Sequence, residues 1–425
     1  MRADLIIHSS PQLLTIKGGR QRGESFGELN IIEDGALAIG GENIIGVGKS
    51  QLIRQQFKAQ HEINARGKIL MPGFVDPHTH LVWVGDRAAE FEQRIAGASY
   101  MQIMKAGGGI MGTVMKTRAA SIEEMIASAQ PRMDRMLRYG TTTAEAKSGY
   151  GLDTTSELKI LETIMRLQNE SALELTPTFL GAHAIPSEFS DDPQAYADLV
   201  SQEMLPAVHA WWLQNFPEEA LPFNDVFCEE GAFTLAQSKQ IMDAAMHLGF
   251  PLKIHADEFA ALGGTRLAVD LAAVSADHLV STPADEIRAL GKSGTIAVSL
   301  PCTPFGLSAE AYTPASAILE AGGCLAIATD LNPGTAWCES MQFSIALACR
   351  YLRITPAQAI VAATINAAAA ISHDDRIGSM EEGKQADVLI LDIDDYRHLG
   401  YRFGTNLVTT VIKKGKVVIS DDEHH

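Results

Sequence analysis

Residues 68–80 read Lys68-Ile-Leu-Met-Pro-Gly-Phe-Val-Asp-Pro-His-Thr-His80, a short apolar run that ends in two histidines separated by one residue. Side chains alternate between the faces of a strand, so residues i and i+2 point the same way. If the run is a strand, the imidazoles of His78 and His80 project side by side. Two neutral imidazoles held at a fixed separation provide half of a metal site.

Seven further apolar runs of strand length follow, and helical segments separate most of them. The eight expected strands cover residues 69–77, 142–147, 173–181, 225–229, 251–255, 273–278, 295–300 and 324–329. The expected helices include residues 121–139, 154–169, 235–248 and 283–290, and a last one that opens with Thr355-Pro356. Eight strand–helix units over about 300 residues predict an α/β fold, a (β/α)8 TIM barrel. A doubly wound open sheet is the alternative, although no Gly-x-Gly-x-x-Gly follows the first strand.

Short β segments punctuated by Gly and Asn occupy both ends of the chain. They cover residues 3–8, 35–41 and 43–48 near one end, and 386–392 and 408–418 near the other. Because both ends share this pattern of short strands, we expect one small β-sandwich domain built from both termini. The expected division gives residues 1–67 and 375–425 to this domain and residues 68–374 to the barrel.

The composition narrows the class of partner. The chain has 425 residues and a formal net charge of −18, which argues against nucleic acid or an anionic membrane as a partner. A small anionic substrate is still compatible, because a local arginine outweighs a distant field. The five cysteines form no Cys-x-x-Cys pair, and no apolar run is long enough to span a bilayer. We expect a cytoplasmic protein with reduced thiols.

Two segments, 87–120 and 185–224, are longer than barrel loops usually are. The first contains Gly107-Gly-Gly109, which reads either as part of a lid or as an ordinary turn, and not as a phosphate loop. The second contains an expected helix with Trp211 and Trp212. The final His-His pair reads either as native sequence or as the remnant of a tag.

Five of the thirteen histidines lie at expected strand ends, where a barrel gathers its functional residues. The polar residues at these ends are Lys147, Ser148, Tyr150, His78, His80, His183, Glu229, Glu230, His255, Glu258, His278, Asp330 and Asn332. Histidine has no structural preference for such positions. Their gathering therefore indicates a metal site.

Three of these histidines and one carboxylate form the expected ligand set. His78, His80 and His255 supply nitrogens and Asp330 an oxygen, a set that suits Zn²⁺ or Fe²⁺ in a catalytic site rather than Ca²⁺ or Mg²⁺. Such an ion would lower the pKa of its water from about 15.7 toward roughly 7. Asp330 could accept the proton of that water. His278 could orient the water or polarise a carbonyl, or it could be a buried hydrogen-bonded histidine.

Two motifs resemble the metal-dependent amidohydrolase superfamily, namely Pro72-Gly-Phe-Val-Asp-Pro-His-Thr-His80 and Gly378-Ser-Met-Glu-Glu-Gly-Lys-Gln-Ala-Asp387. Within it, further motifs resemble the imidazolonepropionase family and run through the chain in order. They are His80-Leu-Val-Trp-Val-Gly-Asp-Arg87, Gly107-Gly-Gly-Ile110, Lys147-Ser-Gly-Tyr150-Gly-Leu-Asp153, Phe179-Leu-Gly-Ala-His183, His255-Ala-Asp-Glu258, Ala276-Asp-His278 and Thr329-Asp-Leu-Asn-Pro-Gly-Thr335.

The resemblance implies hydrolysis of a ring C–N bond, converting 4-imidazolone-5-propanoate to N-formimidoyl-L-glutamate in histidine degradation. It also implies the metal ligands His78, His80, His255 and Asp330. The implied catalytic residues are Asp330, His278 and Glu258, with the division of proton transfer among them left open. The implied substrate-binding residues are Arg87, Tyr150, His183, Glu258, Asn332, Gly334 and Thr335.

Elementary chemistry agrees with several of these roles. A propionate needs a cation, and the planar guanidinium of Arg87 matches a carboxylate, with Tyr150 as an added donor. The alternative for Arg87 is a surface salt bridge with Asp86 or Glu90. Glu258 could accept the ring N–H. Glu229 and Glu230 have no expected role beyond a structural or solvated pair.

One absence bears on the number of metal ions. Two-metal amidohydrolases bridge their ions with a modified lysine at the end of strand four, which here ends Phe227-Cys-Glu-Glu230. Lys147 lies on the second strand, so we expect one zinc or iron ion per subunit. A homodimer is compatible with the superfamily. The alternatives in function are another amidohydrolase that opens a cyclic amide or deaminates a heteroaromatic ring, and a non-catalytic relative of the same fold.

Overall fold

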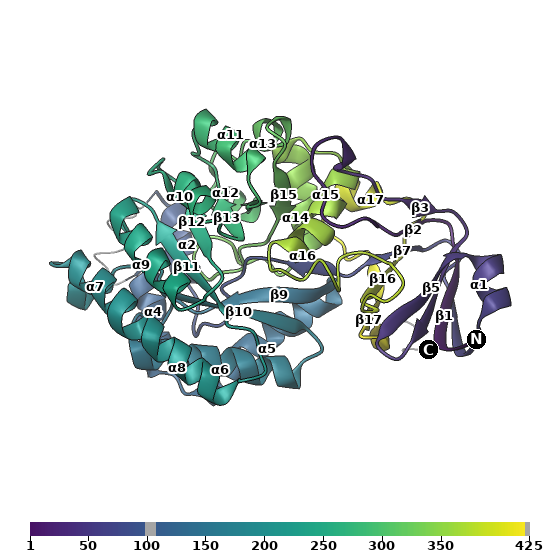
Figure 1. Ribbon diagram of the computed structural model, residues 1–425, viewed down its shortest axis with the longest axis horizontal. Coiled ribbons are helices and arrows are strands. Elements are labelled where there is room, and N and C mark those ends of the chain that lie inside the picture. Colours follow the sequence, from purple (N-terminus) through teal and green to yellow (C-terminus); the bar gives the residue numbers. More distant parts are fainter. Residues whose placement is uncertain (98–107, 421–425) are drawn as a thin grey trace.

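A parallel eight-stranded barrel dominates the computed structural model, which describes residues 1–97 and 108–420 (Figure 1). Its strands follow one another in chain order, and each pair of neighbouring strands is parallel. They are β8 (Phe74–Asp76), β9 (Thr141–Lys147), β10 (Glu174–Ala182), β11 (Phe223–Cys228), β12 (Lys253–Ala256), β13 (Ser275–His278), β14 (Ile296–Ser299) and β15 (Cys324–Ile327). The predicted barrel is confirmed, and seven strands lie within two residues of their predicted bounds.

The first predicted strand is wrong in one respect. Residues 69–77 form two strands, β7 (Ile69–Pro72) in another sheet and β8 in the barrel. The chain changes sheets at Gly73, whose N–H donates to Asp387 O at 3.0 Å. A Cβ at this position would overlap the side chain of Thr142, so glycine permits the close approach.

Backbone hydrogen bonds close the barrel just beyond the ends of β8 and β15. Asp330 N donates to His78 O at 3.1 Å, and His80 N donates to Leu331 O at 2.9 Å. An isolated parallel bridge joins Thr79 to Leu331. This seam places the two histidines of the opening stretch beside Asp330, although about 250 residues separate them in the chain.

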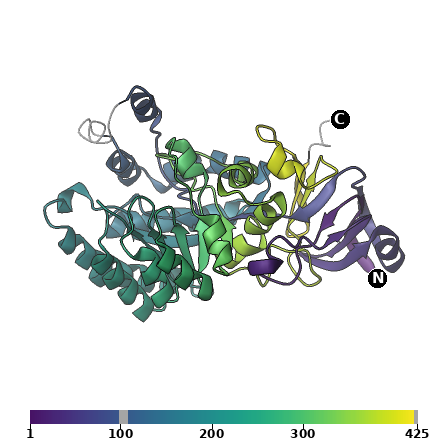
Figure 2. The ribbon, with the colours of Figure 1, turned by 90° about the horizontal axis from the view of Figure 1, so that it is seen from above.

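Helices cover the outside of the barrel (Figures 1 and 2). They are α2 (Ala88–Ile95), α4 (Ile110–Ala119), α5 (Ile122–Arg138), α6 (Thr154–Glu170), α7 (Pro193–Leu199), α8 (Leu205–Asn215), α9 (Leu235–His247), α10 (Gly264–Asp270), α11 (Ala284–Lys292), α12 (Cys302–Gly306), α13 (Ala315–Glu320), α14 (Met341–Leu347), α15 (Pro356–Ala362), α16 (Ile365–Ala369) and α17 (His398–Tyr401). Single-turn elements are η1 (Gly23–Ser25), η2 (Ser187–Phe189), η3 (Val200–Met204) and η4 (Ala348–Leu352).

The six predicted helices are confirmed, including the one that contains Trp211 and Trp212, which is α8. The helix after Thr355-Pro356 is α15, and Thr355 and Gln358 form a capping box at its start. Gly107, of the glycine run that reads as part of a lid or as a turn, lies outside the described residues, as does the final His-His pair. No helix among residues 1–97 and 108–420 is both long and apolar enough to cross a membrane.

Two mixed sheets lie beside the barrel, and strands from both ends of the chain build them (Figure 1). One has the order β5-β4-β1-β6, and the other has the order β18-β17-β16-β7-β2-β3. Their bounds are β1 (Arg2–Ser10), β2 (Leu13–Leu14), β3 (Ile31–Ile32), β4 (Gly35–Gly40), β5 (Asn43–Lys49), β6 (Lys58–Asn64), β16 (Val388–Leu391), β17 (Val408–Lys413) and β18 (Lys416–Ser420), with α1 (Ser50–Gln56) packed alongside. One apolar cluster includes Leu5 and Leu37 from the first sheet and Val388 and Ile412 from the second. We propose that this sandwich is one domain divided from the barrel near residues 67 and 375.

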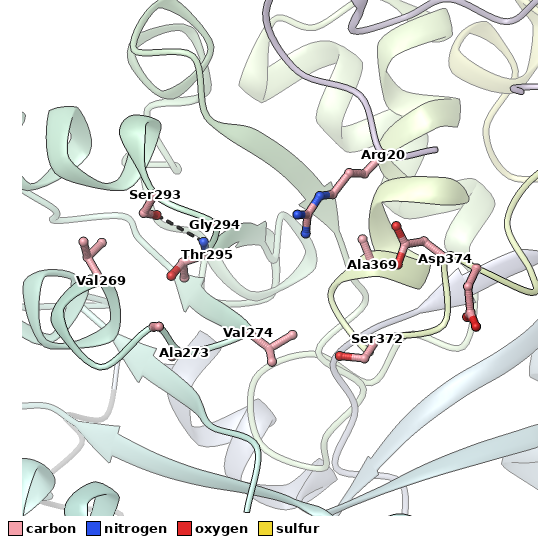
Figure 3. A pocket seen from close by; sticks show the side chains of 12 residues that line it. Arg20, Val269, Ala273, Val274, Ser293, Gly294, Thr295, Ala369, Ser372 and Asp374 are labelled. Atoms are coloured by element: carbon pink, nitrogen blue, oxygen red, sulfur yellow. Dashed lines mark hydrogen bonds between the residues drawn. The ribbon is translucent and has the colours of Figure 1, made fainter. Parts of the chain in front are cut away.

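A cavity of about 520 Å³ lies at the opposite end of the barrel from the histidines (Figure 3). Its wall includes Ala273 and Val274, which precede β13, and Thr295, which precedes β14, together with Arg20. These positions lie at the N-terminal ends of the strands. Residues at that end of a barrel serve stability more often than chemistry.

Candidate active site

Four side chains from strand ends converge at the C-terminal mouth of the barrel. The Nε2 atoms of His78 and His80 each lie 3.5 Å from Asp330 Oδ1. The Nε2 atom of His255, in β12, lies 3.4 Å from His80 Nε2. One nitrogen from each histidine lies within 4.8 Å of the other two. Ligand atoms on a tetrahedral ion with bonds of about 2.1 Å sit roughly 3.4 Å apart, so this spacing suits an ion.

The protonation of His78 shows that a cation belongs between these groups. His78 Nδ1 lies 2.6 Å from Asp277 Oδ2, and a carboxylate only accepts, so Nδ1 carries the proton. In the neutral ring Nε2 is then an acceptor, and it faces another acceptor, Asp330 Oδ1. Neither atom makes a hydrogen bond within the described part of the chain, although both are buried. Two buried acceptors that face one another fit a bound cation.

Burial keeps two of the imidazoles neutral. It lowers the pKa of His78 and of His80 well below the ordinary histidine value, and neighbouring positive groups lower both further. Neutral imidazole is the form that binds a metal. The gathering of His78, His80 and His255 confirms that these residues form a candidate metal site.

Two further predicted residues stand beside the cluster. The ring of His183 stacks on that of His80 with a centroid distance of 4.7 Å, and its Nδ1 donates to Gly149 O at 3.0 Å. Burial lowers the pKa of His183 to about 3, so its Nε2 is a free acceptor. The Tyr150 ring lies 5.3 Å from that of His183. Burial raises the pKa of Tyr150, which keeps its hydroxyl a donor.

His278 and Glu258 lie on the far side of the ligands. His278 Nδ1 is 3.6 Å from Glu258 Oε2, and His278 Nε2 is buried without a hydrogen-bond partner among the described residues. One ligand atom each of His78, His278 and Asp330 lies within 4.8 Å of the others. Burial, with the charge of Asp330, raises the pKa of Glu258 well above its ordinary value. Glu258 is therefore positioned to donate as well as to accept.

The backbone is strained at two of these positions. His278 has a φ of 79° and Asp330 a φ of 55°, the left-handed region that residues other than glycine seldom adopt. Such conformations cost about 1–3 kcal/mol each and cluster at functional sites.

Glu229 has a structural function, as the sequence predicted, and Glu230 is exposed. The buried carboxylate of Glu229 accepts hydrogen bonds from the backbone N–H groups of Phe259 at 2.8 Å and Ala260 at 3.1 Å. It thereby fixes the loop that carries Glu258.

Arg87 makes one of the two predicted surface salt bridges. Its Nε and Nη2 atoms lie 2.8 Å and 2.7 Å from Glu90 Oε2, and Glu90 Oε1 accepts from Gly109 N at 3.1 Å. The guanidinium also presses against Gly334, where a Cβ would overlap Nη1. Because Gly334 follows the C-terminal end of β15, this contact places the guanidinium on the mouth side of the barrel.

Asn332 organises the loop after β15. Its Oδ1 accepts from Gly334 N and Thr335 N, both at 2.8 Å, and its Nδ2 donates to Asp330 O at 2.7 Å. The side chain is occupied by its own loop, and the backbone of Gly334 and Thr335 is held beside Asp330.

Sequence reasoning missed a layer of charged residues beneath the histidines. Asp225, Asp277, Glu145 and Lys253 are buried within β9, β11, β12 and β13. Asp225 Oδ2 lies 2.9 Å from His255 Nδ1, and Asp277 Oδ2 lies 2.6 Å from His78 Nδ1. The sequence carried a signal for part of this layer. Glu145 and Lys253 stand two residues before Lys147 and His255, so on a strand they point to the same interior face.

Comparison with known proteins identifies the family to which the sequence is similar. The profile of the Amidohydrolase family matches residues 69–418. The chain is 52% identical over 422 residues to an imidazolonepropionase of Herpetosiphon aurantiacus, and 48% identical over 423 residues to one of Chloroflexus aggregans. Each match covers 99% of both chains.

Solved structures agree on the fold. An adenosine deaminase from Xanthomonas campestris with bound zinc superposes with a TM-score of 0.74 at 20% identity, covering 99% of this chain and 94% of that one. A 5-methylcytosine deaminase from Klebsiella pneumoniae has a TM-score of 0.72 at 18% identity, covering 99% and 98%. At such identities the likeness shows the barrel and its accessory sheets, and nothing about substrate.

Proposed function

Because the chain belongs to the imidazolonepropionases of the amidohydrolase family, we propose that its three clustered histidines and Asp330 hold one zinc or iron ion for ring hydrolysis. The substrate is 4-imidazolone-5-propanoate and the product N-formimidoyl-L-glutamate. The observation that carries the site assignment is the buried pair of facing acceptors, His78 Nε2 and Asp330 Oδ1. An ion of this kind supplies a Lewis acid, which lowers the pKa of water from about 15.7 toward roughly 7.

Asp330 moves the proton in this proposal. Its carboxylate accepts a proton from the attacking water, whose oxygen bonds to the ring carbonyl carbon. The C–N bond then breaks, the carbonyl becomes a carboxylate, and the ring nitrogen leaves with a proton. His278, whose Nε2 is free among the described residues, polarises the carbonyl oxygen.

Glu258 holds the ring in place. Burial raises the pKa of its carboxyl group, which lies beside His278 and can pair with the ring N–H. The Glu229 carboxylate fixes the Glu258 loop through backbone N–H groups. Orientation of this kind contributes to rate by holding the reacting atoms in line.

Arg87 binds the propionate, with help from neighbouring donors. Its guanidinium offers paired N–H groups to a carboxylate, and Tyr150 adds a hydroxyl. His183, whose ring stacks on that of His80, adds a polar side chain beside Tyr150. Asn332 shapes the wall by holding Gly334 and Thr335 in place. Arg87 exchanges its partner Glu90 for the substrate, or shares its donors between the two.

The fourth barrel strand, β11, supports the proposal of a single ion. It ends at Cys228, and no lysine follows it before Gly231. Lys147, on β9, is engaged by carboxylates instead. The proposal extends to a cytoplasmic enzyme that forms a homodimer and uses neither nucleic acid nor membrane as a partner.

An absorbance assay tests this function. Purified protein of known metal content is mixed with freshly generated 4-imidazolone-5-propanoate, and the decay of its ultraviolet absorbance is compared with a blank without enzyme. We expect rapid decay that a chelator abolishes and that Zn²⁺ or Fe²⁺ restores. No decay in protein with one ion bound would contradict the substrate and favour another cyclic amide or a heteroaromatic amine. Full activity with two ions per chain would contradict the single site.

A further inference from the structure

A buried ammonium group lies behind the histidine cluster. Lys147 ends β9, and its Nζ atom is 2.7 Å from Asp225 Oδ2 and 3.9 Å from Asp277 Oδ2. All three side chains are fully buried. Burial alone would lower the pKa of Lys147, but the carboxylates of Asp225 and Glu145 outweigh it and raise the pKa above the ordinary value. Lys147 is therefore charged at neutral pH.

The same two carboxylate oxygens also face imidazoles. Asp277 Oδ2 lies 2.6 Å from His78 Nδ1, and Asp225 Oδ2 lies 2.9 Å from His255 Nδ1. A continuous chain of contacts thus runs from His78 through Asp277, Lys147 and Asp225 to His255. One ammonium joins two of the candidate metal ligands, which come from opposite sides of the barrel.

No other cation in the described part of the chain pairs with both aspartates. Lys253 reaches Asp277 at 3.8 Å and Glu145 at 3.5 Å, but its closest partners are carbonyl oxygens, including that of Pro77 at 3.0 Å. Glu145 contacts Lys147 at 2.8 Å from the other side and so fixes the ammonium in place. Among the described residues, Lys147 is therefore the cation that contacts both aspartates, while Asp277 Oδ1 also accepts from Ser275 Oγ at 2.6 Å.

We propose that Lys147 is a positioning residue of the metal site. Its ammonium pairs with Asp225 and lies beside Asp277. It thereby keeps the Asp225 carboxylate against His255 Nδ1 and the Asp277 carboxylate in its hydrogen bond with His78 Nδ1, with both Nε2 atoms turned toward the ion. Without the ammonium, Asp225 and Asp277 repel one another and the two imidazoles lose their common orientation. The inference rests on the proposed metal site, and loss of such an outer partner typically costs 10–100-fold in metal affinity.

A purely electrostatic role for Lys147 predicts the opposite sign. A buried positive charge near the site repels a cation, so its removal would tighten metal binding. The direction of the change in affinity therefore separates a positioning role from a through-space effect of charge.

The test measures Zn²⁺ affinity without substrate. Metal-free full-length protein, prepared with a chelator, competes with a chromophoric chelator for Zn²⁺ alone. We expect Lys147→Met to weaken Zn²⁺ binding by about 10–100-fold. The matched control is Lys413→Met, because Lys413 is another buried lysine held by two carboxylates, Asp387 at 2.7 Å and Glu174 at 2.9 Å, in the small domain. The control should bind Zn²⁺ like the parent.

Unchanged or tighter Zn²⁺ binding by Lys147→Met overturns the proposal. If that variant fails to fold, the Zn²⁺ affinities of Lys147→Gln, Asp225→Asn and the double variant are compared in a double-mutant cycle. Positioning requires that the two substitutions be strongly non-additive in Zn²⁺ affinity, whereas additive effects overturn it. The parent's hydrolysis of substrate is measured separately, so a protein that binds Zn²⁺ but does not hydrolyse the substrate contradicts the proposed function alone.

Discussion

Asp330 and His78 are joined twice across the seam of the barrel. The backbone N–H of Asp330 donates to His78 O at 3.1 Å, and Asp330 Oδ1 lies 3.5 Å from His78 Nε2. The first and last barrel strands precede these residues. Closure of the barrel therefore sets the separation of the two groups, which makes the site a product of the fold rather than of a flexible loop.

Replacement of Asp330 by asparagine tests this pair. The amide has the same shape but cannot accept the proton of water, so kcat should fall by about 10²–10⁴-fold. The metal content should fall as well, because a neutral amide is a weaker ligand. The measurements are the absorbance assay and metal analysis of the same sample. Asp387→Asn, a buried aspartate in the small domain, is the control and should keep both. A variant Asp330→Asn with more than a tenth of the parent's kcat would contradict the role.

Arg87→Ala tests recognition of the propionate. Hydrogen bonds to charged groups contribute about 1.5–3 kcal/mol, so KM should rise roughly 10–150-fold while kcat changes less. A competitive inhibitor that lacks the carboxylate should bind the variant and the parent equally. Arg135→Ala is the control, since Arg135 pairs with Glu339 at 2.8 Å at the surface. Equal weakening of charged and neutral ligands would show that Arg87 supports the loop instead.

Glu229→Gln tests the anchor of the Glu258 loop. The amide replaces one acceptor oxygen with a donor that faces backbone N–H groups, so the free energy of unfolding should fall by about 1–3 kcal/mol. Because the loop carries Glu258, kcat should fall too. Denaturant unfolding and the absorbance assay measure the two effects. Glu230→Gln, at the exposed neighbouring position, should change neither. A stable but fully active Glu229→Gln variant would show that other contacts hold the loop.

Glu174 gives a prediction for pH. Burial alone would raise its pKa, but Lys413 at 2.9 Å and Arg376 outweigh burial and lower it. A lowered folded pKa adds stability above the unfolded value of about 4.3, and this stability is lost as the pH falls below that value. Glu174→Gln should therefore cost about 1–3 kcal/mol in unfolding free energy at pH 7 and progressively less below about pH 4. Urea unfolding at several pH values measures this, with the exposed Glu162→Gln as control. A cost that does not decline with acid would rule out the ionic origin.

The local framework of this protein could be predicted from its amino-acid sequence. The alternation of apolar residues placed seven barrel strands within two residues of their positions, and the Thr355 cap placed the start of α15. It also placed His78, His80 and His255 at strand ends, where the structure gathers them. These features could be predicted because strand periodicity and helix caps depend on neighbours in the chain.

Which side chains contact one another could not be predicted before the fold was known. Gly73 looks like the middle of one strand until its closeness to Thr142 shows why the chain changes sheets there. Lys147 looks like one more residue of a motif until β11 and β13 bring Asp225 and Asp277 to it. The physical reason is that such contacts depend on register and closure of the whole barrel. Two residues far apart in the chain become partners only when the folded sheet fixes the distance between them.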